Sequence, residues 1–264
     1  MPSPQHIGFL GDIHCGSHYG LWPDELLPSR GYSGVKYLNE CWSHLCDSWP
    51  QLDMLVLMGD LIDGPQAKSK GTGLFDTDLS KQAEGAIEVI QQAVDKLQPS
   101  RILRVDGTPY HEGFHGAMRL IDKHFQIAKR DSQQVIDINL GTKKEPAILN
   151  VAHHPMGGST LYAGTQLDKE MLWANLSAHR GKVPAVRWIV RAHRHFFGLM
   201  RDGWTTMIAN PCWQLATPHA VKGNYWKWQP DIGGVLMSRD ETEELSYSIR
   251  PTLYDLPKRE VLTV

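Results

Sequence analysis

Two short apolar runs that each lead into an aspartate through a glycine constrain the fold of this chain most. The runs cover residues 6–12 and 53–59; Asp12 closes the first, and Asp60 follows the second. Strands of a parallel sheet that are buried on both faces have continuous apolar sequences of this kind. Residues 34–49, between the runs, carry apolar side chains at helical spacing. The three segments predict a βαβ unit that brings both aspartates to one edge of a sheet.

The rest of the chain continues with further strands and helices, and polar or glycine-rich loops follow several of the strands. This order indicates an α/β fold, and no linker, repeat or low-complexity tract divides the chain. We therefore expect a single domain over residues 1–264. Strands are expected at 101–105, 135–140, 147–152, 185–190, 196–201, 204–209, 234–238 and 245–250, and helices at 79–97, 118–125 and 167–179.

Composition and charge exclude several classes of protein. With 27 basic and 29 acidic residues the formal charge is −2, which gives no long-range attraction to nucleic acid or to a membrane surface. The longest apolar runs, such as residues 54–58, are far shorter than the roughly 20 residues that cross a bilayer. Residues 1–10 have no secretory pattern, and four cysteines in 264 residues are too few for a disulfide scaffold. We therefore expect a cytoplasmic protein without membrane contact.

Acidic and imidazole side chains follow five of the expected strands. In an open α/β sheet, ligand sites assemble at the carboxyl ends of the strands. A single aspartate there is more often a cap or turn residue, and a single histidine is more often a surface or core residue. The repeated placement is what indicates a site. The residues are Asp12 with His14, then Asp60, His111, His153 with His154, and His193 with His195.

The spacing and the chemistry of these donors favour a pair of transition-metal ions. In Asp12-Ile13-His14 and in His193-Arg194-His195, the side chains at i and i+2 share a face if the chain is extended, so each pair could bind at one site. Imidazole and carboxylate donors without thiolates suit Mn²⁺, Fe, Zn²⁺, Ni²⁺ or Co²⁺ better than Ca²⁺, and manganese is our first choice. A shared carboxylate can hold two such ions about 3.5–4 Å apart.

Taken together, five short blocks resemble the calcineurin-like metallophosphoesterases. The resemblance runs from about residue 6 to 210. It implies a four-layer α-β-β-α sandwich of two mixed β-sheets with the metal site at the strand C-terminal ends, and it places the C-terminal β-rich part, about 196–264, in the second sheet. The blocks are Gly11-Asp12-Ile13-His14, Gly59-Asp60-Leu61-Ile62-Asp63, Gly107-Thr108-Pro109-Tyr110-His111-Glu112, His153-His154-Pro155 and Ala192-His193-Arg194-His195.

The resemblance also implies a role for each matching residue. Asp12, His14 and His195 would bind the first metal. Asp60 would bridge the two ions, and His153 and His193 would bind the second. His111 would lie beside the scissile phosphate rather than on a metal.

The chain departs from the family pattern in its third block. The family has an asparagine ligand there, whereas Thr108-Pro109-Tyr110 separates Gly107 from His111 in this sequence. The hydroxyl of Thr108 or a water molecule could replace the amide. His153 is preferred to His154 as a ligand because it stands two residues before Pro155, and His154 would then lie behind the ligands. Asp63 or Glu112 either orients a ligating imidazole or is a solvated turn residue.

These residues favour hydrolysis of phosphodiesters, of nucleotide or nucleic-acid type, by a metal-bridging hydroxide with His111 as general acid. The alternatives are a DNA or RNA nuclease of the same superfamily and a non-catalytic scaffold that retains the fold. Two further groups each have two possible interpretations. The tryptophans either stack on a base or pack in the core, and the lysines either contact a phosphate or are solvated. They are the C-terminal Trp204, Trp213, Trp226 and Trp228 and the loop residues Lys68 and Lys70.

Overall fold

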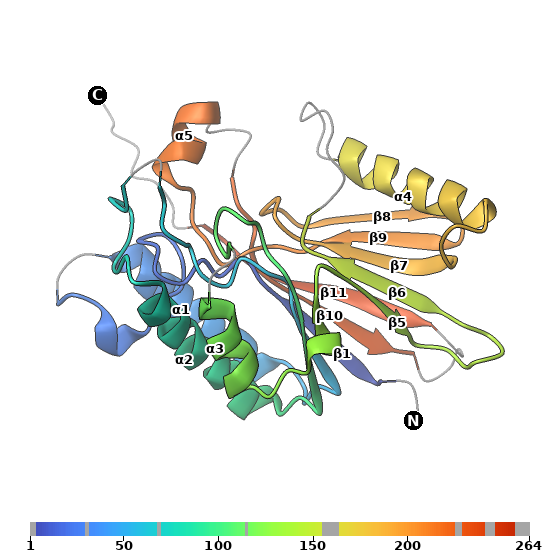
Figure 1. Ribbon diagram of the computed structural model, residues 1–264, viewed down its shortest axis with the longest axis horizontal. Helices are drawn as coiled ribbons and strands as arrows, with labels where there is room; N and C mark the ends of the chain where they lie inside the picture. Colours follow the sequence, from blue (N-terminus) through green and yellow to red (C-terminus); the bar gives the residue numbers. More distant parts are fainter. Residues whose placement is uncertain are drawn as a thin grey trace.

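The predicted βαβ unit forms the centre of a six-stranded sheet. The computed structural model describes residues 4–29, 32–67, 70–113, 116–154, 164–224, 229–240 and 246–256. The first sheet has the order β11-β10-β1-β2-β3-β4 (Figure 1), in which β1 to β4 are parallel and β10 and β11 are antiparallel to their neighbours. Its strands are β1 (His6–Leu10), β2 (Met54–Leu57), β3 (Arg101–Val105), β4 (Ser132–Gln133), β10 (Ile232–Arg239) and β11 (Tyr247–Tyr254).

The second sheet has five strands in the order β5-β6-β7-β9-β8. The inner strands β6, β7 and β9 are parallel, and the edge strands β5 and β8 are antiparallel to their neighbours. Both sheets are therefore mixed, as expected. The strands are β5 (Val135–Asn139), β6 (Ile148–Ala152), β7 (Val186–Arg191), β8 (Gly198–Asp202) and β9 (Thr205–Ala209).

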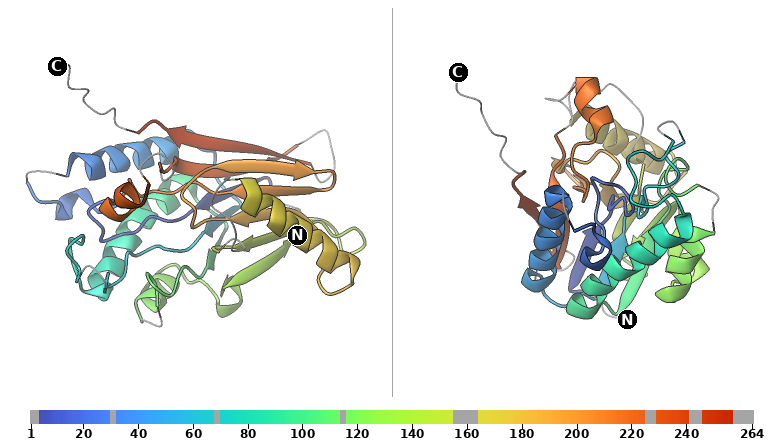
Figure 2. Two further views of the ribbon diagram at one scale, coloured as in Figure 1. Left: turned by 90° about the horizontal axis from the view of Figure 1, so that it is seen from above. Right: turned by 90° about the vertical axis from the view of Figure 1, so that its left-hand side faces the viewer.

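Helices cover the two outer faces of the sheet pair, which gives four layers. Figure 1 shows α1, α2 and α3 gathered on one side and α4 on the other, and α4 again lies apart from α1 and α2 in the left view of Figure 2. None of the described helices is long and apolar enough to span a bilayer. The helices are α1 (Ser33–Ser48), α2 (Leu79–Leu97), α3 (Ala117–His124), α4 (Gly164–His179) and α5 (Pro218–Asn224), with the short 3-10 turns η1 (Asp24–Leu26) and η2 (Lys129–Asp131).

The continuous apolar sequences of the central strands follow from burial on both faces. Alternate side chains of β2 point in opposite directions. Leu55 and Leu57 pack with the helices of the first sheet, whereas Met54 and Val56 pack in the core between the sheets. A third apolar cluster, which includes Leu167, lies between α4 and the second sheet.

One expectation about the C-terminal part is wrong. Strands β8 and β9 do belong to the second sheet, but β10 and β11 belong to the first, where Gly8 of β1 pairs with Leu236 of β10. The free edge of β1 needs hydrogen-bond partners inside the core. Residues 232–237 are all buried, which suits β10 for that central position.

Candidate metal centre

Four strand ends from the two sheets meet at one place. Beyond β1 and β2 the chains stay side by side: the Asp12 amide donates to Gly59 O at 2.9 Å, and the His14 amide donates to Asp60 O at 3.0 Å. Beyond β6 and β7, the Ala192 amide donates to His153 O at 3.0 Å. The sheets are joined where the His193 amide donates to Asp12 Oδ2 at 3.0 Å.

The backbone at this junction is left-handed rather than extended. Positive φ angles occur at five of the six predicted metal-type residues, so the extended geometry assumed for the two i, i+2 pairs is wrong. Each non-glycine residue in such a conformation costs about 1–3 kcal/mol, and such residues cluster at functional sites. The five angles are 48° at Asp12, 44° at His14, 48° at Asp60, 67° at His193 and 56° at His195.

The six residues form two triads of potential ligands. Within each triad the donor atoms lie within 4.8 Å of one another. Asp12 and His14 share a triad, as their spacing predicts, whereas His193 and His195 belong to different triads. The first triad is Asp12, His14 and His195, and the second triad is Asp60, His153 and His193.

One oxygen of Asp12 lies between the triads. Asp12 Oδ1 is 3.3 Å from Nε2 of His195, 3.8 Å from Nε2 of His14 and 3.9 Å from Nε2 of His153. Asp60 Oδ2 is 3.1 Å from Nε2 of His153. Asp12 Oδ1 thus lies within 4 Å of imidazole nitrogens of both triads, and the bridging role of Asp60 stays a prediction.

Two buried atoms that could bind a metal ion make no hydrogen bond among the described residues. His153 Nδ1 donates to the Met58 carbonyl at 2.7 Å, so its Nε2 faces the site. Within the described ranges, neither buried atom meets hydrogen-bond geometry; each has only ion-pair contacts, the shortest being His153 Nε2 with Asp60 Oδ2 at 3.1 Å and Asp12 Oδ1 with His195 Nε2 at 3.3 Å. Unsatisfied buried polar atoms are costly. A metal ion between the triads would satisfy both atoms.

The charges of the site also suit metal binding. Burial opposes ionisation of Asp12 and Asp60, but neighbouring imidazoles, His153 foremost, outweigh it and hold the pKa of each carboxyl below its ordinary value. Burial also opposes the charged form of His153, yet Asp12 and Asp60 raise its pKa to about 9. Burial and the nearby His153 lower the pKa of His193 to about 4. The carboxylates are thus ionised and His193 is neutral, the forms in which they bind metals, whereas His153 carries a proton that a metal ion would displace.

Thr108 and Glu112 hold the loops that carry the site. The Thr108 amide and hydroxyl both donate to Asp60 Oδ1, at 2.6 and 3.0 Å, so the structure places Thr108 against the carboxylate. Buried Glu112 accepts the amides of Leu61 at 3.0 Å and Gly107 at 2.6 Å. Both sequence interpretations of Glu112 are therefore wrong: among its described contacts it orients backbone, not an imidazole, and it is not solvated.

Asp63 lies behind the first triad, where it is buried and contacts the imidazole of His14. Its Oδ1 accepts from His14 Nδ1 at 2.9 Å and from Gln214 Nε2 at 3.2 Å, and Gln66 donates to its Oδ2. His111 Nδ1 donates to the Asp63 carbonyl at 2.7 Å, and its ring packs edge-on against His14 with centroids 4.5 Å apart. The side chains that orient the first triad thus come from loops far apart in sequence.

The remaining candidate residues have mixed positions. The exposed His154 lies outside both triads, with its ring centroid 4.4 Å from that of His193. Trp213 is fully buried and packs on Trp42, whereas Trp204 is 62% exposed. Neither amide partner of Asp63 had a sequence signal, since an isolated glutamine forms no motif. Lys68, Trp226 and Trp228 lie outside the described residues.

Comparisons with known proteins give likenesses of fold at low identity. No family model matches the sequence, and no curated protein matches it. Among solved structures, the chain is similar to Vps29 of Chaetomium thermophilum, with a TM-score of 0.45 and 11% identity over 96% of this chain and 99% of that one. It is similar to YfcE, a phosphoesterase from E. coli, with a TM-score of 0.44 and 14% identity over 89% of each chain.

A third similar structure contains zinc. It is Vps29 of Entamoeba histolytica complexed with zinc, with a TM-score of 0.42 and 11% identity over 95% of this chain and 99% of that one. The function proposed below rests on the geometry of the two triads and not on these likenesses.

Gly59 has no room for a side chain because the backbone of Gly107 and the ring of His153 approach it closely. Its φ is 81°, and a Cβ would lie 2.7 Å from Gly107 Cα and 2.9 Å from His153 Nδ1. Gly181 has a similar φ of 66° but has nothing within 4 Å of a Cβ. Comparing substitutions at the two positions therefore distinguishes the cost of a left-handed backbone from the cost of a steric clash.

We expect Gly59→Ala to weaken Mn²⁺ binding strongly and to lower the free energy of unfolding by more than the about 1–2 kcal/mol that a left-handed alanine costs. Gly181→Ala should show only that cost and bind Mn²⁺ normally. Urea unfolding and calorimetric titration with Mn²⁺ measure both effects. Equal losses in the two variants would show that the close approach at Gly59 is unimportant.

Proposed function

We propose that the protein is a divalent-metal-dependent phosphoesterase that hydrolyses phosphodiesters. The observation that carries this proposal is the pair of acid–imidazole triads. Two of their potential metal-binding atoms, Asp12 Oδ1 and His153 Nε2, are buried and make no hydrogen bond among the described residues. The strained backbone around the triads supports it, since a fold without a ligand here gains nothing from that strain. The resemblance of the five sequence blocks to the calcineurin-like metallophosphoesterases agrees with it.

The residues present suit two ions. Asp12, His14 and His195 would hold one, and His153 and His193 with Asp60 would hold the other. Mn²⁺ is the first choice, with Fe, Zn²⁺, Ni²⁺ or Co²⁺ as alternatives. Such ions neutralise the charge of a phosphate and lower the pKa of bound water. Hydrolysis of a phosphodiester at neutral pH requires both effects. The protein supplies the fixed spacing of the triads. Thr108 holds the Asp60 carboxylate in place through its amide and hydroxyl.

His111 has the geometry of a proton donor. Because the Asp63 carbonyl accepts from Nδ1, the second nitrogen, Nε2, remains to face a substrate. The ring lies against His14 and its side chain is 20% exposed, so it stands at the boundary between the buried triads and solvent. From there an imidazolium could protonate a leaving alkoxide, a step that is typically worth about 10²–10⁴ in rate.

The preferred substrates are nucleotide or nucleic-acid diesters. The net charge of −2 argues against extended duplex binding, because phosphate contacts supply most non-specific affinity. A nuclease of the same superfamily is the competing activity. We also propose a reducing, cytoplasmic setting, supported by the four buried cysteines, Cys15, Cys41, Cys46 and Cys212, which are all free thiols.

The activity is tested with metal-depleted protein re-supplied with Mn²⁺, Zn²⁺, Ni²⁺, Co²⁺ or Fe²⁺. We expect hydrolysis of bis-p-nitrophenyl phosphate to return with the metal, and the same preparation is assayed on a monoester, cyclic nucleotides and labelled single and double strands. Asp12→Asn should abolish the recovery, whereas the exposed Asp168→Asn should not. Failure of every metal on every substrate would contradict the proposal and favour the scaffold alternative.

The role of His111 is tested by varying the leaving group. His111→Ala should lower turnover of alkyl diesters by about 10²–10⁴, because these need a proton at the leaving oxygen, and should affect p-nitrophenyl esters far less. The exposed His124→Ala is the matched control, since His124 contacts only Gln91 and Phe125 among its described partners. Equal losses on both leaving groups would exclude proton donation by His111.

A further inference from the structure

The helical layer over the second sheet is incomplete. Helix α4 packs on β7, β8 and β9, whereas the outward-facing Val135, Asp137 and Asn139 of edge strand β5 are exposed. A hollow therefore lies between α4 and the β5 side of the sheet. Its lining residues belong to neither triad.

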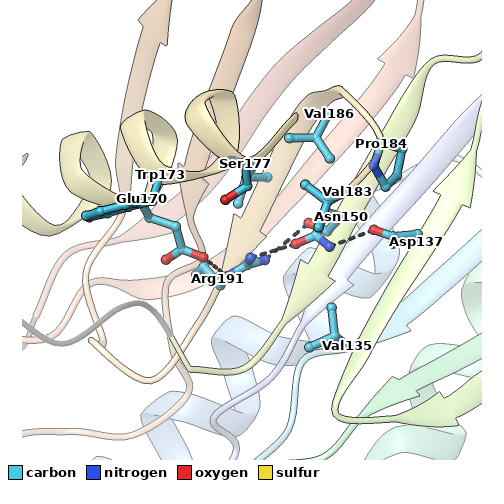
Figure 3. Close-up of a pocket in the computed structure, with 12 residues that line it drawn as sticks. Val135, Asp137, Asn150, Glu170, Trp173, Ser177, Val183, Pro184, Val186 and Arg191 are labelled. Carbon is cyan, nitrogen blue, oxygen red and sulfur yellow. Dashed lines mark hydrogen bonds and ion pairs between the residues drawn. The ribbon is translucent and has the colours of Figure 1, made fainter. Parts of the chain in front are cut away.

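The hollow is a pocket of about 450 Å³ with mostly apolar walls (Figure 3). Sites for small molecules usually measure about 300–1,000 Å³ and combine apolar walls with a few placed polar groups. Trp173 on α4 and Val135 on β5 are 47% and 50% exposed, so large apolar surfaces border it. Its apolar lining is Val135, Trp173, Ala174, Val183, Pro184, Val186 and Ile189.

A row of hydrogen-bonded polar side chains crosses the pocket. Arg191 pairs with Glu170 on one side and donates to Asn150 Oδ1 at 2.6 Å on the other. Asn150 Nδ2 in turn donates to Asp137 Oδ1 at 2.6 Å. Figure 3 shows this row running from α4 to β5. Arg191 and Glu170 are buried, whereas Asp137 is exposed.

The row disfavours an anion and favours a cation. Besides Glu170 and Asn150 Oδ1, the Arg191 guanidinium donates to the backbone carbonyls of Asn150 and Val190, so four of its five N–H groups are engaged. The lining carries two carboxylates and one guanidinium, a formal charge of −2 + 1 = −1. Asp137 is exposed and can accept from a ligand as well as from Asn150.

We propose that this pocket binds a small organic cation, an amine or guanidinium attached to an aromatic or branched aliphatic body. The charged group would pair with Asp137, and the apolar body would lie against Val183 and Pro184, which Figure 3 shows on the same side of the row. The site is independent of the metal centre. Ligand binding here requires neither a metal nor hydrolysis.

The test uses 2-phenylethylamine as the cationic probe, with 2-phenylethanol and phenylacetate as neutral and anionic probes of similar shape. Calorimetric titration of the whole chain should show saturable binding of the amine, about fivefold or more tighter than the alcohol, with phenylacetate weakest. Asp137→Asn should reduce the affinity for the amine to that for the alcohol. Val183→Ala should weaken both by about threefold or more.

Matched controls lie on exposed positions outside the pocket. Asp202→Asn and Val221→Ala should leave binding of all three probes unchanged, and thermal unfolding checks that every variant is folded. The proposal is overturned if no probe binds saturably, if phenylacetate binds as well as the amine, or if Asp137→Asn keeps the preference for the amine. Mn²⁺ binding should be unaffected by Asp137→Asn, so this result does not depend on the proposed hydrolysis.

Discussion

Burying Asp12 and Asp60 close to each other is the constraint on which the rest of the structure depends. Both carboxylates are almost fully buried, and each lowers the tendency of the other to ionise. An isolated buried carboxylate costs several kcal/mol. The protein offsets that cost with the His153 imidazole, with the amide and hydroxyl of Thr108 on Asp60, and with the His193 amide on Asp12. Asp12 Oδ1 is still left without a hydrogen bond among the described residues.

The loops that carry the site are fixed by bonds to the backbone as much as by side-chain packing. Glu112 clamps the loops after β2 and β3 through the amides of Leu61 and Gly107, and Arg104 lies 3.5 Å from its carboxylate. Arg104 also binds Asp122 on α3. The helix layer, the strand ends and the loops are therefore one connected network. Such support keeps the side chains of the two triads in place despite their left-handed backbone.

Most of the fold could be predicted because its signals are local. Helix α2 and strand β3 have the expected bounds, since their apolar spacing and flanking polar residues lie within the segment. The convergence of Asp12, Asp60, His153 and His193 could be predicted from their positions after strands. The partner of β10 could not, because a fully apolar strand fits either sheet, and the choice depends on which core strand has a free edge.

The finer geometry of the site lay beyond sequence patterns. Asp12 and His195 have positive φ angles, and their backbones form hydrogen bonds with loops distant in the sequence. The residue types alone do not predict these angles. The contact of Glu112 with two amides and that of Gln214 with Asp63 likewise depend on tertiary structure. The resemblance to a family grouped the donors by metal, whereas spacing alone would have kept His193 and His195 together.

The most direct measurement is anomalous X-ray diffraction from crystals of the protein grown with Mn²⁺. Two anomalous peaks should appear about 3.5–4 Å apart, one bounded by Asp12, His14 and His195 and the other by Asp60, His153 and His193. Crystals of folded protein with millimolar Mn²⁺ and no anomalous density at either triad would contradict the account.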